Sequence, residues 1–199
     1  SRHLSRITKI SYPSGDIIWN MGIEHGAGDI DFGMDLNFSF QHSLQILDNG
    51  NLITLDNGNL SQTLFGTDYP TSRGLEIQIY SNSSAEIIWE YELPQNLFGF
   101  ASGNVQKLEN ENYLITTVGD GGTSLEINPA NEIVWEGKYN LTLPAGAVYR
   151  AQRIPGLFAG NFSFILPKKI DFENNVLELS QSENTLEFQI INESNYNGK

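Results

Sequence analysis

The chain of 199 residues has no cysteine, which excludes disulfides and thiolate chemistry. It has no run of about 18 apolar residues, so no membrane span is expected. Basic residues are scarce: 11 lysines and arginines stand against 24 aspartates and glutamates, and no basic stripe exists for a nucleic-acid partner. No stretch shows helical periodicity with caps, and the acidic residues lack EF-hand spacing. These absences favour an all-β protein and predict no metal and no cofactor.

The tryptophans show that the sequence repeats. Each ends a tetrapeptide of one acidic and two aliphatic residues, at Asp16–Trp19, Glu86–Trp89 and Glu132–Trp135. A second marker is a glutamine followed two positions later by an aliphatic residue, at Gln45, Gln106 and Gln152. The last two tryptophans and the last two glutamines are both 46 positions apart. A period near 46 with short strands is typical of a four-stranded β-propeller blade.

The turns divide one repeat unit into strands. Residues 41–47 and 51–55 are expected as strands joined by Asp48-Asn49-Gly50, because Asn-Gly favours tight hairpins. Leu75–Tyr80 alternates apolar and polar residues, which indicates a half-buried strand, and Glu86–Glu92 is expected as the fourth strand. The tryptophans are expected in the core. Long loops are expected at 22–37 and 59–72.

The repeat predicts an all-β propeller fragment of about two and a half blades from a six-bladed ring, followed by a C-terminal β module. The blade segments are 1–22, 40–93, 101–140 and the inner strand 146–158. The predicted domains are 1–158 (propeller) and 159–199 (linker and partial β module, with strands at 176–179 and 186–191). Because propellers close with about four to eight blades, we expect an excised or processed piece that is inactive alone.

Two histidines depart from the repeat. Three positions before the marker glutamines stand His42, Gly103 and Tyr149. His42 begins an innermost strand, which in a propeller lines the central channel. Aligning Trp19 on Trp89 places His3 opposite Arg73, on a loop expected at the same rim as His42. Residues on long loops of a rigid scaffold often carry function.

Each of these features also has a purely structural interpretation. A lone histidine in a β protein is usually a surface residue or a hydrogen-bonded core residue. The Asp-Asn-Gly segments at 48–50 and 56–58 are explained as ordinary tight turns, since Asn-Gly supplies the positive φ that such turns need. His25, in the glycine-rich insert, receives no role.

Several spaced motifs carry a family likeness over roughly residues 1–158. In chain order they are Ser1-Arg2-His3, Gly15-Asp16-Ile17-Ile18-Trp19, Gln41-His42, Asn49-Gly50-Asn51-Leu52, Asp56-Asn57-Gly58, Ser72-Arg73-Gly74-Leu75-Glu76 and Tyr149-Arg150-Ala151-Gln152-Arg153-Ile154. Together they resemble the arylsulfotransferases (aryl-sulfate sulfotransferases).

The resemblance implies a six-bladed propeller that transfers a sulfuryl group from a phenolic sulfate ester to a phenol without a nucleotide donor. It also implies an exported protein, periplasmic or extracellular. The family histidine that is transiently sulfurylated falls on His42, and that of the Ser-Arg-His motif falls on His3. The family's catalytic arginine falls where this chain has Gly22 and Ile23, so Arg2 or Arg73 is the candidate replacement.

The chemistry fits these residue types. A neutral imidazole is a competent nucleophile near pH 7, phenolate is a good leaving group, and cations must surround the sulfate oxygens. We therefore predict His42 as nucleophile and His3 as acid or cation, with Arg2, Arg73 and Asn57 binding a small phenolic sulfate donor and a phenol acceptor. The alternative is a non-catalytic binding or adhesion propeller of an exported protein, which the missing arginine favours.

Overall fold

The computed structural model describes residues 1–23, 36–81, 84–141, 144, 146–154, 162–165 and 189–192. The chain divides into two compact units, Ser1–Arg153 and Ile154–Lys199. In the second unit β11 (Phe162–Ile165) pairs antiparallel with β12 (Gln189–Asn192), which overlaps the end of the strand expected at 186–191. The strand expected at 176–179 lies outside the described residues. None of the helices in the described part of the chain is long and apolar enough to cross a membrane.

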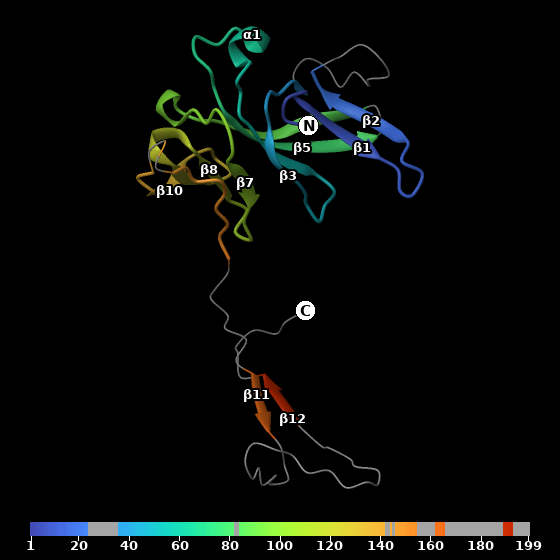
Figure 1. Ribbon diagram of the computed structural model, residues 1–199, viewed down its shortest axis with the longest axis vertical. Helices are drawn as coiled ribbons and strands as arrows, with labels where there is room; N and C mark the ends of the chain where they lie inside the picture. The colour runs from blue at the N-terminus through green and yellow to red at the C-terminus, as the bar shows by residue number, and fades with distance from the viewer. Residues whose placement is uncertain are drawn as a thin grey trace. The chain divides into compact units, whose positions relative to one another are not determined.

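The first unit contains a four-stranded antiparallel sheet in the order β3-β4-β5-β6 (Figure 1). Its strands are β3 (His42–Ile46), β4 (Leu52–Asp56), β5 (Arg73–Ser81) and β6 (Ser84–Glu92). The hairpin between β3 and β4 is closed by Leu47, whose N–H donates to the Asn51 carbonyl at 2.8 Å and whose carbonyl accepts from the Gly50 N–H. The strands predicted from the turns and the alternation are all present.

A second sheet repeats this topology. It consists of β7 (Asn104–Lys107), β8 (Tyr113–Thr117), β9 (Thr123–Ile127) and β10 (Ile133–Lys138), again in sequential antiparallel order. The register repeats too, since Ile53 pairs with Glu76 in the first sheet and Leu114 with Glu126 in the second. A two-stranded sheet, β1 (Arg6–Ile10) with β2 (Ile17–Gly22), precedes both. The fold is that of a propeller fragment, whereas a ring of six blades stays a prediction.

The hydrophobic core lies between the sheets. One cluster joins the β1–β2 hairpin to β4 and β5, and the other joins β4 to strands β7, β8 and β9. Trp19 is buried, and Trp89 stacks on Tyr113 with ring centroids 3.5 Å apart. The prediction that every tryptophan is in the core is wrong for Trp135, which is 51% exposed. Trp135 lies on β10, at the outer edge of its sheet, where no other sheet of the described chain packs over it.

Two expected segments differ from the prediction. Residues 146–154 form no strand; instead the side-chain amides of Asn104 and Gln106 bind the backbone of Ala151 and Arg153 in reciprocal pairs. The loop expected at 59–72, which connects β4 to β5 in the chain, contains α1 (Ser61–Phe65), seen at the top of Figure 1. Two short 3-10 helices, η2 (Gln95–Leu97) and η3 (Gly119–Gly121), follow later in the chain. Most of the loop expected at 22–37 lies outside the described residues.

Candidate functional site

His42 is the first residue of β3 and stands at a β-bulge. It pairs with Leu55, and the next β3 residue in register, Gln45, pairs with Ile53, so β3 uses three steps where β4 uses two. The Thr54 hydroxyl donates to the His42 carbonyl at 2.9 Å, which fixes the backbone of the bulge. Bulges increase local twist and redirect side chains, and here the bulge presents a half-buried imidazole.

Asn57 lies beside His42 and is fully buried. Its Oδ1 is 2.6 Å from Nδ1 of His42, and its Nδ2 donates to the carbonyls of Gly99 at 2.5 Å and Ser102 at 3.0 Å. The predicted role of Asn57 in substrate binding therefore needs correction. Its amide is enclosed, and each of its polar atoms is bound within the protein, so it contacts the histidine and the loop at 99–102 and not the solvent.

The glutamine before His42 brings the N-terminal segment to this place. Gln41 is buried, and its Nε2 donates to the carbonyls of Ser1 at 3.2 Å and Arg6 at 2.9 Å. The Phe40 N–H donates to the Ser5 hydroxyl at 3.1 Å. The Gln-His motif thus does two things: it places the imidazole on β3 and fastens the Ser-Arg-His segment next to it.

Arg2 and His3 contact each other and the same loop. Nη1 of Arg2 donates to Nε2 of His3 at 3.0 Å, and Nη2 donates to the Phe100 carbonyl at 3.1 Å. The Arg2 guanidinium lies 4.7 Å from the centroid of the Phe40 ring. Among the described residues no carboxylate pairs with Arg2. His3 is exposed, and because Arg2 only donates, Nε2 of His3 carries a lone pair in this arrangement.

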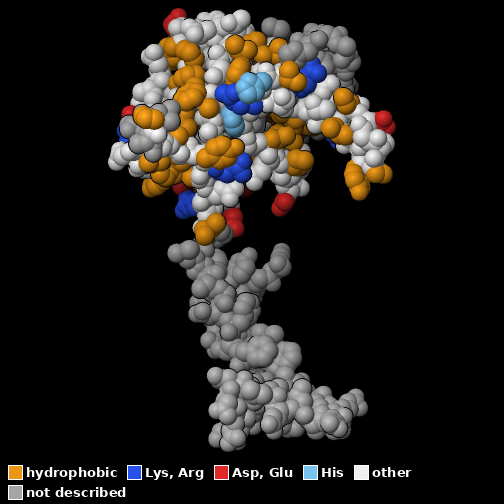
Figure 2. Space-filling view, in the orientation of Figure 1, with side chains coloured by type: hydrophobic (Ala, Val, Ile, Leu, Met, Phe, Trp, Pro, Cys, Tyr) orange, Lys and Arg blue, Asp and Glu red, His pale blue; other side chains and the backbone are white. Residues whose placement is uncertain are grey.

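His3, Arg2, His42 and Asn57 are therefore brought together around the loop at 99–102. The Ser102 N–H donates to Nε2 of His42 in a long hydrogen bond of 3.4 Å. Ser102 follows Phe100, whose carbonyl binds Arg2, by two residues. Figure 2 shows histidine and basic side chains gathered on one face of this unit with hydrophobic side chains around them. The chain has a net charge of −13, but Arg2 gives this face a local positive charge.

Arg73 is not part of this group. Its Nε and Nη2 donate to Asp56 Oδ2 at 3.0 and 2.9 Å, and Nη2 also donates to the Asn37 carbonyl. Burial raises the pKa of the Asp56 carboxyl, while the Arg73 charge and two backbone N–H groups act in the opposite direction. The prediction that Arg73 binds sulfate is not supported, because a buried carboxylate already occupies its donor fork.

Comparison with known families decides what kind of protein this is. A family model described as arylsulfotransferase matches residues 1–140, which is most of the chain. The chain belongs to the arylsulfotransferase family. The family supports a sulfotransferase-type function on phenolic substrates. None of the curated proteins compared with the chain matches it.

Gly22, one of the two residues at the position that the resemblance assigns to an arginine, has no room for a side chain. Gly22 has φ +119°, and a Cβ added there would lie 2.2 Å from the Ser5 carbonyl oxygen. A side chain at Gly22 would require the backbone to move. The guanidinium of Arg2, on the neighbouring segment, contacts His3 and the same loop that contacts His42.

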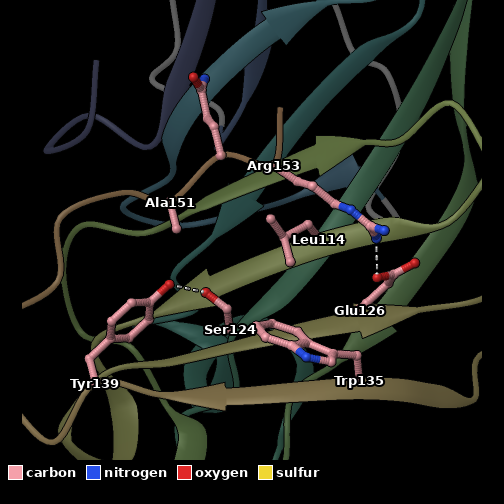
Figure 3. A pocket seen from close by; sticks show the side chains of 8 residues that line it. Leu114, Ser124, Glu126, Trp135, Tyr139, Ala151 and Arg153 are labelled. Carbon is pink, nitrogen blue, oxygen red and sulfur yellow. Dashed lines mark hydrogen bonds and ion pairs between the residues drawn. The ribbon is translucent and has the colours of Figure 1, made fainter. Parts of the chain in front are cut away.

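A pocket among the described residues lies away from the two histidines. It has a volume of about 410 Å³ on the face of sheet β7–β10 (Figure 3), lined by Leu114, Ser124, Glu126, Trp135, Tyr139, Ala151, Gln152 and Arg153. Tyr139 and Ser124 share a hydrogen bond across its floor, and Arg153 pairs with Glu126. The corresponding face around Trp89 is covered by Tyr113 of the next sheet, so the pocket is an open sheet face and not the histidine site.

Sequence reasoning missed the loop at 99–102, which binds both histidine segments. Gly99 is fixed because its N–H donates to the Ser72 hydroxyl at 3.0 Å and a Cβ there would lie 2.3 Å from Thr117 Oγ1. Ser102 has φ +58°, and positive φ also occurs at Ser5, Phe40 and Ser43 around the site. Strained backbone of this kind clusters at functional sites. The sequence signal for this loop was the pair of glycines at 99 and 103 that flank a phenylalanine.

Proposed function

We propose that the protein transfers a sulfuryl group from a phenolic sulfate ester to a phenolic acceptor, without a nucleotide donor, through a covalent sulfo-histidine at His42. The observation that carries the proposal is the grouping of His42, Arg2 and His3 around one loop. An exported location, periplasmic or extracellular, is part of the proposal and rests on the family alone.

In the first half-reaction the Nε2 lone pair of His42 attacks sulfur. The N–S bond forms, the bond from sulfur to the aryl oxygen breaks, and the electron pair leaves with the phenolate, whose conjugate acid has a pKa of about 10. Negative charge on the sulfuryl oxygens then needs a cation. Arg2 supplies a planar fork of donors that no described carboxylate occupies.

In the second half-reaction the acceptor phenol attacks the sulfur of sulfo-His42. The N–S bond breaks, its electron pair returns to Nε2, and the phenolic proton must go to a base. Nε2 of His3 is suited to take it once Arg2 has turned from His3 to the sulfate oxygens. His3 thus acts as the base for the acceptor in this proposal, and Arg2, rather than His3, is the cation for the sulfate.

The release of p-nitrophenol from p-nitrophenyl sulfate, with phenol as acceptor, tests the proposal in the full-length protein. We expect His42→Ala to abolish release and Arg2→Ala to slow it by about 100-fold, a typical loss for one charge-stabilising donor. Lys9→Ala is the matched control, because Lys9 is an exposed cation on β1 away from the histidines. Release that persists in His42→Ala ends the proposal.

The second candidate function is a non-catalytic binding module. The observation that favours it is Gly22, where the resemblance places a catalytic arginine and a side chain would require the backbone to move. A full-length protein that binds an aryl sulfate but releases no phenol would establish this function instead.

A further inference from the structure

The orientation of the Asn57 amide is fixed by its surroundings. Both hydrogens of Nδ2 are used, one toward the Gly99 carbonyl at 2.5 Å and one toward the Ser102 carbonyl at 3.0 Å. A flipped amide would set Oδ1 against two carbonyl oxygens inside a fully buried environment, which is costly. Oδ1 must therefore face His42, and it can only accept a hydrogen bond.

The fixed amide decides which nitrogen of His42 carries the proton. Nδ1 lies 2.6 Å from Oδ1, so the hydrogen of that bond belongs to Nδ1. A neutral imidazole has one N–H, and Nε2 therefore holds the lone pair. The long contact from the Ser102 N–H to Nε2 is consistent with this, because Nε2 accepts there.

We propose that Asn57 is a positioning residue that holds His42 as the Nδ1–H tautomer and so aims the Nε2 lone pair at the substrate. The proposal rests on the proposed function of His42 as the sulfuryl acceptor. When Nε2 forms the bond to sulfur, the ring becomes cationic, and the Nδ1–H···Oδ1 bond becomes charge-assisted and stronger. The same amide anchors the loop at 99–102, so the protonation of His42 and the position of that loop are coupled through one side chain.

The neighbouring sheet shows that the fold does not need this pair. In the numbering of the repeat, Gly103 stands at the place of His42 and Val118 at the place of Asn57. The β7–β8 pairing is regular without them. A histidine and its amide partner thus occur together in one sheet and are absent together from the other, as expected for a functional pair.

The direct test is nitrogen NMR of histidine-labelled full-length protein, which distinguishes a protonated ring nitrogen from one with a lone pair. We expect the wild type to show His42 with protonated Nδ1 and bare Nε2. In Asn57→Ala we expect a mixture of both tautomers and a rate of sulfo-enzyme formation lower by about 10- to 100-fold, the range typical for residues that orient a functional histidine. Asn49→Ala is the control, because Asn49 occupies the same place in the other Asp-Asn-Gly turn, and it should leave tautomer and rate unchanged.

Asn57→Asp separates positioning from a merely structural role. Its carboxylate keeps an acceptor for Nδ1–H, so the tautomer should remain that of the wild type, although its second oxygen faces the carbonyls of Gly99 and Ser102 and should displace the loop. Equal losses in both variants with wild-type tautomers throughout would overturn the proposal, as would a wild-type His42 protonated on Nε2. Those results would leave the proposed sulfo-His42 step intact. Turnover in His42→Ala would instead overturn the proposed function, and the tautomer measured in the wild type would stand.

Discussion

The sheets β3–β6 and β7–β10 have the same strand order and the same register, yet they differ where β3 and β7 begin. Strand β3 has a bulge at His42, whereas β7 begins at Asn104, after Gly103, and pairs with β8 without a bulge. The core positions of the two sheets are alike, and the differences gather at one end around a single loop. The comparison teaches that the repeat specifies the scaffold and that departures from it mark the candidate site.

A second difference lies at the next paired position. Asp56 pairs with Arg73 across β4 and β5, where the other sheet pairs Thr117 with Thr123. The threonine hydroxyls donate to the carbonyls of Leu97 and Gly119, so they are satisfied without a charge partner. A blade can therefore be built with neutral residues here, and the buried ion pair is particular to the sheet that holds His42.

The largest effect on stability should come from separating this ion pair. Arg73→Thr leaves the buried Asp56 carboxylate unpaired, and we expect a loss of about 3 to 5 kcal/mol in the free energy of unfolding. The double variant Asp56→Thr with Arg73→Thr copies the neighbouring sheet and should recover a large part of that loss. Urea denaturation measures both. Additive losses in the double variant would show that the two sheets are not interchangeable at this position.

The tryptophans at equivalent places should differ in their contribution to stability. Trp89 stacks on Tyr113, whereas Trp135 is 51% exposed. We expect Trp89→Ala to cost about 3 kcal/mol, and Trp135→Ala to cost about 1 kcal/mol because half of its surface is already in water. Chemical denaturation of the two variants checks the difference. Equal costs would indicate that another sheet covers Trp135 in solution.

The smallest effect on stability should come from Glu126 on β9. Side-chain donors from Asn112 and Asn110, together with Arg153, lower the pKa of Glu126 in the folded chain. A lowered folded pKa adds stability above the unfolded value of about 4.3, and this stability is lost as pH falls through the folded pKa. Glu126→Gln should therefore be less stable than the wild type at pH 7, and the difference should shrink toward pH 3. A difference that stays constant with pH would contradict this account.

Much of the scaffold could be predicted because it depends on short-range patterns. The tryptophan tetrapeptides and marker glutamines gave the period, and Asp48-Asn49-Gly50 gave the first hairpin. Helix α1 was not predictable, since five residues are too few to show a helical period. The exposure of Trp135 depends on which sheet packs over β10, and periodicity within a strand contains no information about that neighbour.

Part of the candidate site could be predicted from the sequence, and the catalytic roles of its residues stay a prediction. His42, His3 and Arg2 stood out as departures from the repeat or as motif residues, and the structure groups them. The roles of Asn57 and Arg73 depend on partners that only tertiary structure supplies: the carbonyls of Gly99 and Ser102 lie more than 40 positions from Asn57 in sequence. The ion pair between Asp56 and Arg73 could in principle have been predicted from the sequence, because the two residues are directly opposite once the strands are aligned.

The most direct test of the central claim is the intact mass of the full-length protein after mixing with p-nitrophenyl sulfate and no acceptor. The account predicts one added sulfuryl group on the wild type, located on the peptide that contains His42. It predicts the same adduct in His3→Ala, with slower discharge to phenol, and no adduct in His42→Ala. An adduct that persists in His42→Ala, or turnover by the wild type with no covalent adduct at any time, would contradict it.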